Sequence, residues 1–310
     1  MKTRPARVAC LLLFPAIAAL SLGACSTHDG VKSKHRDTRV FEGLTDIDHV
    51  EIRSKKGRVD IAPYGTGLPG WAQHALDEYV YSPSPDSYFI LAVMQSDERK
   101  RLEKAKLHPE FDGTKLILKA DWPHSFSDDD GDGVEYAIRL PAVHTVDVDN
   151  DFGDIEIKSA QGDARIRSGF GDVELHALAG SADVDTGFGD IEVYFVGDSI
   201  ERSVLDTGFG DIDAENIAGP IKADSGFGDI KLELTDDNAG PVDANSGFGD
   251  VKIYAGPAFE GRHKLHSGFG KTAIRRTAPE DSKRDVTGKS EVSTGFGDAT
   301  VTIREPSDPK

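Results

Sequence analysis

Short alternating runs of apolar and polar residues fill the second half of the chain, and each run predicts a β-strand with one buried face. The runs come in pairs around a phenylalanine. Ala164 and Ile166 stand six and four positions before Phe170. Val173 and Leu175 stand three and five positions after it. The alternation therefore slips by one residue at the phenylalanine, which indicates a corner between two short strands.

Each corner carries the tetrapeptide Gly-Phe-Gly-Asp or a variant that differs by one residue, and successive phenylalanines are separated by 18, 18, 21, 18, 21, 21 and 27 residues. A period near 20 is too short for a repeat of two helices, but it fits one coil of a β-solenoid, which buries its apolar face only against neighbouring coils. We therefore predict an all-β chain, a single-domain β-solenoid (parallel β-helix) of about 18–21 residues per coil, with general chirality favouring a right-handed coil. The corner phenylalanines are Phe152, Phe170, Phe188, Phe209, Phe227, Phe248, Phe269 and Phe296.

The two corner glycines allow a sharp bend, because glycine adopts positive φ without a steric penalty. The residue after the second glycine is an aspartate in seven corners and Lys271 in the other. Stacked coils would place these carboxylates roughly 4.8 Å apart. We interpret them as turn-forming acceptors of backbone hydrogen bonds rather than as a calcium ladder, because the known calcium-binding nonapeptide has a residue between Gly and Asp and a nine-residue period. The aspartates are Asp154, Asp172, Asp190, Asp211, Asp229, Asp250 and Asp298.

The phenylalanines share the parity of the inward residues, so we expect their rings to stack inside the core. The alternative is an outward aromatic stripe that stacks on sugar rings. Two positions before each phenylalanine is a small polar residue that can bond along the ladder or to the corner backbone: Asn150, Ser168, Thr186, Thr207, Ser225, Ser246, Ser267 and Thr294. Four positions after it is an outward column, predicted to be a solvated face: Glu156, Glu174, Glu192, Asp213, Lys231, Lys252, Ala273 and Thr300.

Residues 39–145 alternate less regularly and are predicted to form an irregular β cap over the open end of the solenoid. Within them, residues 54–61 (SKKGRVDI) align with residues 168–175 (SGFGDVEL) and resemble a worn first coil. A short charged helix is expected within residues 97–106. Further strands are expected within residues 79–94, 115–120 and 134–140.

The N-terminus has the pattern of an export signal. Residues 1–24 combine a basic start with an apolar stretch that is too short to span a bilayer, and small residues precede Cys25. The run Leu22-Gly23-Ala24-Cys25 resembles the lipobox of bacterial lipoproteins, which implies cleavage before Cys25 and acylation of its thiol. Ser26 follows where aspartate would favour inner-membrane retention, so the resemblance implies an outer-membrane lipoprotein of the cell envelope, on the periplasmic or the external face.

We accordingly divide the chain into a signal peptide (1–24), a flexible tether (25–38), the β cap (39–145), the repeat solenoid (146–304) and a tail (305–310). Loss of the signal takes three basic residues with it, so the formal charge falls from −18 to −21. An acidic surface of this kind disfavours nucleic acid and anionic lipid, and it leaves cations, basic proteins or neutral glycans as partners. The lipid of the outer membrane would be contacted through acylated Cys25.

One acidic motif has the pattern of a metal site. Asp128, Asp130 and Asp132 alternate before a glycine, as in the first half of an EF-hand calcium loop. The twelfth position, however, is Arg139 instead of the bidentate glutamate, and no helix is predicted before the loop. We favour an acidic hairpin loop, with weak calcium binding as the alternative, and the sequence indicates no other cofactor.

Together, the alternating N-terminal strands, the step Arg139-Leu140-Pro141-Ala142, the Gly-Asp-Ile/Val repeats and the export signal resemble the bacterial putative-adhesin family, a β-solenoid domain of unknown function. The resemblance spans residues 40–303. It implies a surface or periplasmic solenoid and supplies no catalytic residues.

Three functions remain open from the sequence. We expect a non-enzymatic, adhesin-like scaffold that binds an envelope protein or glycan through its repeated surface. A calcium-binding envelope module is the second interpretation. A polysaccharide-active β-helix enzyme is the third, but catalysis needs a unique constellation of residues, and only the coil with His263, His266 and Lys271, followed by the insertion 275–289, departs from the repeat.

Overall fold

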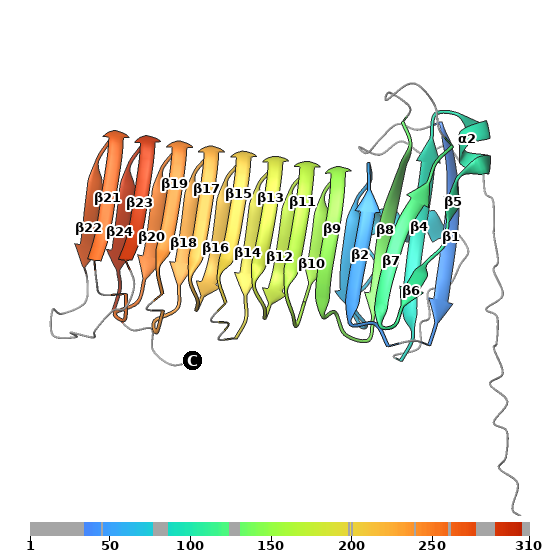
Figure 1. Cartoon of the computed structure of the whole chain (residues 1–310), viewed down its shortest axis with the longest axis horizontal. Helices are drawn as coiled ribbons and strands as arrows, with labels where there is room; N and C mark the ends of the chain where they lie inside the picture. The colour runs from blue at the N-terminus through green and yellow to red at the C-terminus, as the bar shows by residue number, and fades with distance from the viewer. Residues whose placement is uncertain are drawn as a thin grey trace, which may run out of the picture.

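The computed structural model describes residues 34–44, 46–76, 86–123, 131–197, 199, 201–238, 240–259, 262–276 and 289–305. Over these residues the chain forms a long solenoid whose flat coils lie side by side in a row, with antiparallel strands and short helices at one end (Figure 1). The predicted all-β solenoid with parallel coils is confirmed.

Each repeat coil contributes two strands that meet at its corner. The first strand ends on the corner phenylalanine and joins one sheet, here called sheet 1, and the second strand joins the opposite sheet 2. The repeat strands of sheet 1 are β9 Thr145–Phe152, β11 Ala164–Phe170, β13 Ala182–Phe188, β15 Ser203–Phe209, β17 Ile221–Phe227, β19 Val242–Phe248, β21 Arg262–Phe269 and β23 Lys289–Phe296. Those of sheet 2 are β10 Ile155–Lys158, β12 Val173–Leu178, β14 Ile191–Phe195, β16 Ile212–Ile217, β18 Ile230–Leu234, β20 Val251–Ala255, β22 Thr272–Arg276 and β24 Ala299–Ile303.

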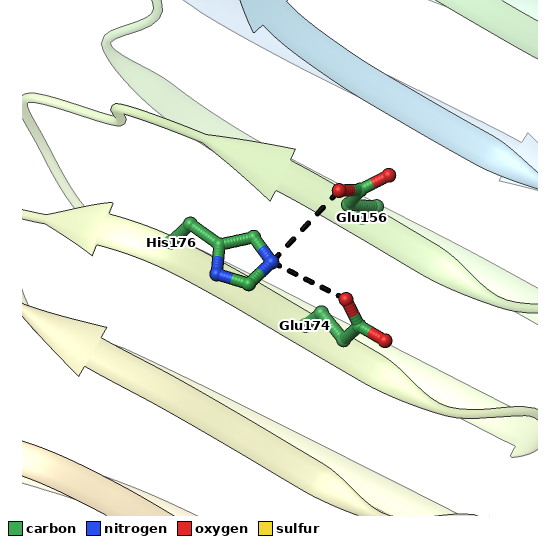
Figure 2. Close-up of side chains that lie close together, drawn as sticks. All are labelled: Glu156, Glu174 and His176. Atoms are coloured by element: carbon green, nitrogen blue, oxygen red, sulfur yellow. Dashed lines mark hydrogen bonds and ion pairs between the residues drawn. The ribbon is translucent and has the colours of Figure 1, made fainter. Parts of the chain in front are cut away.

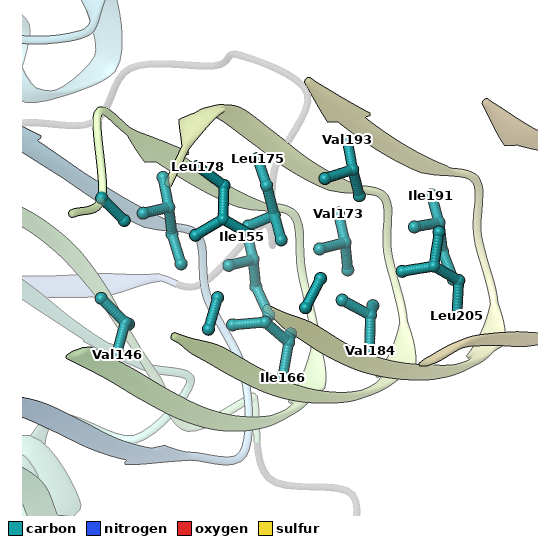
Figure 3. Close-up of a cluster of buried hydrophobic side chains, with 14 of the residues drawn as sticks. Val146, Ile155, Ile166, Val173, Leu175, Leu178, Val184, Ile191, Val193 and Leu205 are labelled. Atoms are coloured by element: carbon teal, nitrogen blue, oxygen red, sulfur yellow. The ribbon is translucent and has the colours of Figure 1, made fainter. Parts of the chain in front are cut away.

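The core lies between the two sheets and consists of the residues that the alternation placed inward. Ile166 and Val184 of sheet 1 and Val173 and Leu175 of sheet 2 are at most 1% exposed, and they belong to one continuous apolar cluster (Figure 3). Because a coil contributes only one strand to each sheet, this burial depends on the coils on both of its sides.

A coil without a corner phenylalanine precedes the repeat. β2 (His49–Ser54) pairs in parallel with β9, and β3 (Val59–Pro63) pairs in parallel with β10. Between them, the amide of Gly57 donates a 2.8 Å hydrogen bond to the carbonyl of Phe152. The segment recognised in the sequence as a worn first coil is therefore a coil of the solenoid.

The N-terminal end is closed by further strands. β7 (Lys115–Asp121) and β8 (Gly133–Leu140) form a coil outside β2 and β3, with parallel pairing to both. Antiparallel strands then extend the sheets: β4 Tyr88–Ser96 and β1 His35–Gly43 beyond β8, and β5 Lys106–Leu107 and β6 Glu110–Asp112 beside β7. Because β1 begins at His35, the last residues of the predicted tether are part of a sheet.

Two short helices accompany this end. α1 (Gly70–Leu76) covers the outer face of sheet 2, where Leu68, Ala72 and Leu76 join Phe89 and Leu91 in a second small apolar cluster. α2 (Arg99–Lys104) lies within the stretch predicted to be a charged helix. Sheet 2 is therefore buried on both faces at this end, whereas its repeat part has one face open.

The last two coils exchange places. β23 pairs with β19 and β24 pairs with β20, so the final coil lies between its two predecessors and the coil of β21 and β22 is outermost (Figure 1). Val292, Val301 and Ile303 of the final coil are at most 1% exposed, whereas Ile274 of the outermost coil is 46% exposed. The exchange therefore places the more apolar coil inside the stack, where its burial is stabilising.

Candidate functional site

The corner phenylalanines form a row on the surface, which we call the phenylalanine edge. Seven rings are 45–48% exposed, and the outermost, Phe269, is 72% exposed. Neighbouring ring centroids lie 4.7–4.9 Å apart, and the ring planes differ by 1–9°. The rings stack as expected, but the prediction that they fill the core is wrong.

The backbone of the corner explains the outward position of the rings. The second glycine has positive φ, for example +137° at Gly171, so the chain turns directly after the ring. The first glycine is forced by close approach, since a Cβ on Gly187 would lie 2.8 Å from the carbonyl oxygen of Gly169. The small polar residue two positions before each phenylalanine points into the corner instead. Thr207, for example, is 1% exposed, and its Oγ1 donates a 3.0 Å hydrogen bond to the carbonyl of Gly189.

The stacking decides which part of each ring a partner can reach. Parallel rings cover one another's faces, so the phenylalanine edge presents mainly ring edges, which carry the positive part of the aromatic quadrupole. Sugar rings stack on aromatic faces. Phe152 and Phe269, at the two ends of the row, each stack on one ring only, and Phe269 is the more exposed of the two. The six rings between them have a neighbour on both faces, which disfavours the sugar-stacking alternative there.

The corner aspartates form a ladder of hydrogen-bond acceptors. Oδ1 of each accepts the amide of the corner residue in the next coil, over distances of 2.7–3.3 Å. The amide of Asp298, together with the ammonium of Lys252, holds the pKa of Asp250 below its ordinary value. The amide of Lys271 donates to Asp298. The coil of Lys271 is the outermost of those described, so no described corner amide beyond it needs an acceptor, and an aspartate is not required at this position.

The acidic motif before β8 is described only in part, since Asp128 and Asp130 lie outside the described residues. Asp132 is described, and its carboxylate is engaged. Oδ1 accepts from the hydroxyl of Ser96 over 2.6 Å, and Oδ2 accepts from Nε of Arg101 in α2 over 2.8 Å. These contacts give Asp132 a role in holding α2 against β4, and the arginine offsets the charge that would attract a calcium ion.

Arg139, which stands where an EF-hand would have its glutamate, is fully buried and forms an ion pair with Asp60. Its guanidinium also donates to the carbonyls of Thr66 and Gly67, over 3.2 and 2.8 Å. Burial raises the pKa of Asp60 in spite of the arginine. The pair fixes the loop before α1 to the outer face of sheet 2.

A cluster that the sequence did not single out lies on the open face of sheet 2. Glu156 of β10 and Glu174 of β12 are register partners, and His176 follows two residues after Glu174 on the same face (Figure 2). Nε2 of His176 lies 3.8 Å from Oε1 of Glu156 and 3.2 Å from Oε2 of Glu174. The sequence predicted that the two glutamates belong to a solvated column. The feature of the sequence that could have indicated the cluster is the histidine at the next outward position of the strand.

The predicted lipidation site and the signal lie outside the described residues, and Cys25 therefore has no structural context here. Among the helices that are described, none has the length and apolar character needed to cross a membrane.

Comparison with known proteins identifies relatives of the fold. The family model described as Toastrack DUF4097 matches residues 132–307. A crystal structure of a putative adhesin from Bacteroides fragilis is similar, with 13% identity and a TM-score of 0.46, over 87% of this chain and 98% of that one. A putative lipid binding protein from Parabacteroides distasonis shares 12% identity, with a TM-score of 0.30, over 86% and 96% of the two chains. Curated proteins gave no match.

Proposed function

This chain belongs to the Toastrack DUF4097 family, and from that premise we propose that it is a non-enzymatic, adhesin-like scaffold of the cell envelope that binds a partner along its phenylalanine edge. The single observation that carries the proposal is the exposure of the ring row. Seven successive spacings of 4.7–4.9 Å make it about 33 Å long, a continuous apolar strip on an acidic protein. Exposed apolar strips of this size on soluble proteins are typical of interaction sites.

The charges beside the strip favour a basic partner. On one side is the ladder of corner aspartates. On the other, on the outer face of sheet 1, are Asp149, Asp185, Asp206 and Asp224, each three positions before its phenylalanine. Arg53, Arg167 and Lys222 pair with Asp149, Asp185 and Asp224 and neutralise part of this charge. Asp206 makes no ion pair among the described residues, and burial, followed by the charges of Asp224 and Asp185, raises its pKa. A partner surface with apolar side chains bordered by lysine or arginine would complement both features.

The exposed ring edges favour a protein over a glycan. An aromatic or aliphatic side chain can pack against the edge of a phenyl ring, whereas a sugar packs on its face. We therefore propose an envelope protein as the partner, with the scaffold held at the outer membrane by a lipid on Cys25. Anchoring is tested by Cys25→Ser, which should abolish lipidation and release the protein from the membrane fraction. A variant that is still processed and membrane-bound would remove the anchor from the proposal.

Retention of envelope proteins on the immobilised full-length chain tests the binding surface. The triple variant Phe188→Ser, Phe209→Ser and Phe227→Ser should lose the proteins that the wild type retains. Tyr194→Ser is the matched control, because Tyr194 is 45% exposed but lies on sheet 2, away from the row. Circular dichroism would establish that the triple variant is folded. Equal retention by a folded triple variant would contradict the proposal, and release of products from envelope glycans would favour the enzyme alternative.

A further inference from the structure

We propose that Glu156, Glu174 and His176 form a binding site for a divalent transition-metal ion, with Zn²⁺ as the expected occupant. The site goes beyond the proposed scaffold function and does not depend on it, because it lies on the outer face of sheet 2 and not on the phenylalanine edge.

The positions of the donor atoms fit one ion. The carboxylate oxygens and the imidazole nitrogen all lie within 4.8 Å of one another. Donors around a tetrahedral Zn²⁺ with bonds of about 2.0–2.2 Å are separated by about 3.3–3.5 Å. The 3.2 Å separation between His176 and Glu174 already matches, and the 3.8 Å separation between His176 and Glu156 closes with small side-chain rotations.

The chemistry of the donors selects the kind of ion. Calcium and magnesium prefer sites made only of oxygen ligands. An imidazole with two carboxylates is instead a typical ligand set for zinc and for other first-row divalent ions. Three protein ligands leave a fourth position open for water or for a side chain of a bound partner.

A second carboxylate cluster on the same face of sheet 2 is neutralised by a lysine of the chain. Further along sheet 2, Nζ of Lys231 lies 3.1–3.2 Å from carboxylate oxygens of Asp213, Glu215 and Glu233. Lys231 occupies the outward column that contains Glu156 and Glu174. At the proposed site two glutamates hold that column and a histidine stands beside them, so the place of the central cation is available to a metal ion.

One lysine competes for the site, and the structure offers it another partner. Nζ of Lys158 lies 2.6 Å from Oε1 of Glu156. It also lies 4.0 Å from Oδ2 of Asp60, an oxygen of a residue that is 3% exposed, and this oxygen accepts no hydrogen bond among the described residues. Asp60 is the register partner of Glu156 on β3. When an ion takes Glu156, Lys158 can move to this unsatisfied oxygen, so metal binding does not leave the lysine without a partner.

The expected physical effect is a clamp between adjacent coils. Glu156 belongs to the coil of β10, whereas Glu174 and His176 belong to the coil of β12. An ion that binds only the folded arrangement stabilises it by mass action. Zn²⁺ should therefore raise the melting temperature of the protein as well as bind to it.

Titration of the full-length chain with ZnCl₂, followed by calorimetry and by thermal unfolding, tests the site. The wild type should show a saturable site and a higher melting temperature, and Co²⁺ should give the visible absorption of a low-coordinate complex. Glu174→Gln combined with His176→Gln should weaken that site at least about tenfold and remove the thermal shift. The matched control is Glu192→Gln, because Glu192 is the register partner of Glu174 one coil further on.

The control variant should bind Zn²⁺ as the wild type does, and CaCl₂ should not reproduce the shift. All of these positions are on an open sheet face, so circular dichroism should show unchanged folds. A double variant that binds Zn²⁺ as tightly as the wild type would overturn the assignment, and so would a wild type that shows no Zn²⁺ binding.

Discussion

The backbone amide of Asp229 donates a 2.7 Å hydrogen bond to Oδ1 of Asp211, which belongs to the preceding coil. The same bond joins each pair of neighbouring corners from Asp154 to Lys271. Each carboxylate thereby receives a backbone dipole, which offsets the repulsion between like charges stacked in a column. The aspartate of the tetrapeptide is thus a connector between coils as well as a residue of the turn.

Two substitutions of Asp211 should distinguish the stabilisation that comes from its acceptor oxygen from the stabilisation that comes from its charge. Asp211→Ala removes the acceptor for the Asp229 amide and should lower the free energy of unfolding by about 1–2 kcal/mol. Asp211→Asn keeps an acceptor oxygen and should cost less than about 0.5 kcal/mol. Urea unfolding would measure both, with Glu192→Ala as a control outside the ladder. An equal loss for Asn and Ala would mean that the charge itself stabilises the corner.

Calcium should have no specific effect on the ladder, because the amide that each Oδ1 accepts already offsets part of the carboxylate charge. Millimolar CaCl₂ should raise the melting temperature no more than NaCl of equal ionic strength, which acts by screening alone. Any excess should disappear with Asp128→Asn and Asp130→Asn. If an excess survived those changes and were lost with Asp211→Asn, the corner aspartates would be a cation ladder.

The exposed, stacked state of Phe209 predicts a moderate cost for its removal. Phe209→Ala should destabilise the protein by about 1–2 kcal/mol, because the ring loses two stacking contacts but only part of its burial. Leu205→Ala in the same strand should cost about 2–5 kcal/mol, because Leu205 is 0% exposed. Chemical denaturation compares the two. A loss for Phe209→Ala as large as that for Leu205→Ala would place the ring in the core after all.

Glu135 should make the protein less stable as the pH rises. Its burial raises the pKa of its carboxyl group, and Nε2 of Gln95 donates to it over 2.7 Å. The unfolded chain therefore releases this proton at a lower pH than the folded chain, and stability falls as the pH rises from 4.5, the ordinary pKa, through the raised value. Glu135→Gln should consequently raise the melting temperature at pH 7 and leave it unchanged near pH 4. A variant less stable than the wild type at pH 7 would show that the charged form is favoured in the fold.

The exchanged order of the last two coils can be tested by cross-linking. Asn245 is the register partner of Ser293, and Ser293 is the partner of His266. In a chain without Cys10 and Cys25, the pair Asn245→Cys and Ser293→Cys should form a disulfide on oxidation, since adjacent strands lie about 4.8 Å apart. The pair Asn245→Cys and His266→Cys should not, because two strand spacings, roughly 9.6 Å, exceed the reach of a disulfide. The opposite result would indicate coils stacked in the order of the sequence.

The sequence predicted the repeat well because its signals are local. Alternation placed Ile166 and Val173 inward, and the glycines marked the corner, since strand parity and backbone freedom are properties of neighbouring residues. The inward prediction for Phe170 was wrong because strand alternation holds only within a strand. The chain bends at the corner, and the bend turns this side chain outward.

Features that depend on distant segments were not accessible in the same way. The cluster of Glu156, Glu174 and His176 joins two coils, and its histidine occurs once in its column, so no repeated pattern indicated it. The order of the last coils was equally hidden, because a period in the sequence gives the spacing of coils and not the order in which they stack. The sequence singled out the coil with His263, His266 and Lys271 as a departure from the repeat, but not as an end of the stack.

The exchange of the last coils also affects how the molecule can assemble. In a chain made from its N-terminus, residues 262–276 are available before residues 289–303, yet the strands they pair with, β23 and β24, belong to the later segment. The final coil therefore has to come between the coil of β19 and β20 and the coil of β21 and β22, so β19 and β20 cannot gain their final partners until residues 289–303 have been made. A chain truncated before residue 289 would lack these partners, which leaves the edges of β19 and β20 available to β21 and β22 or to another chain.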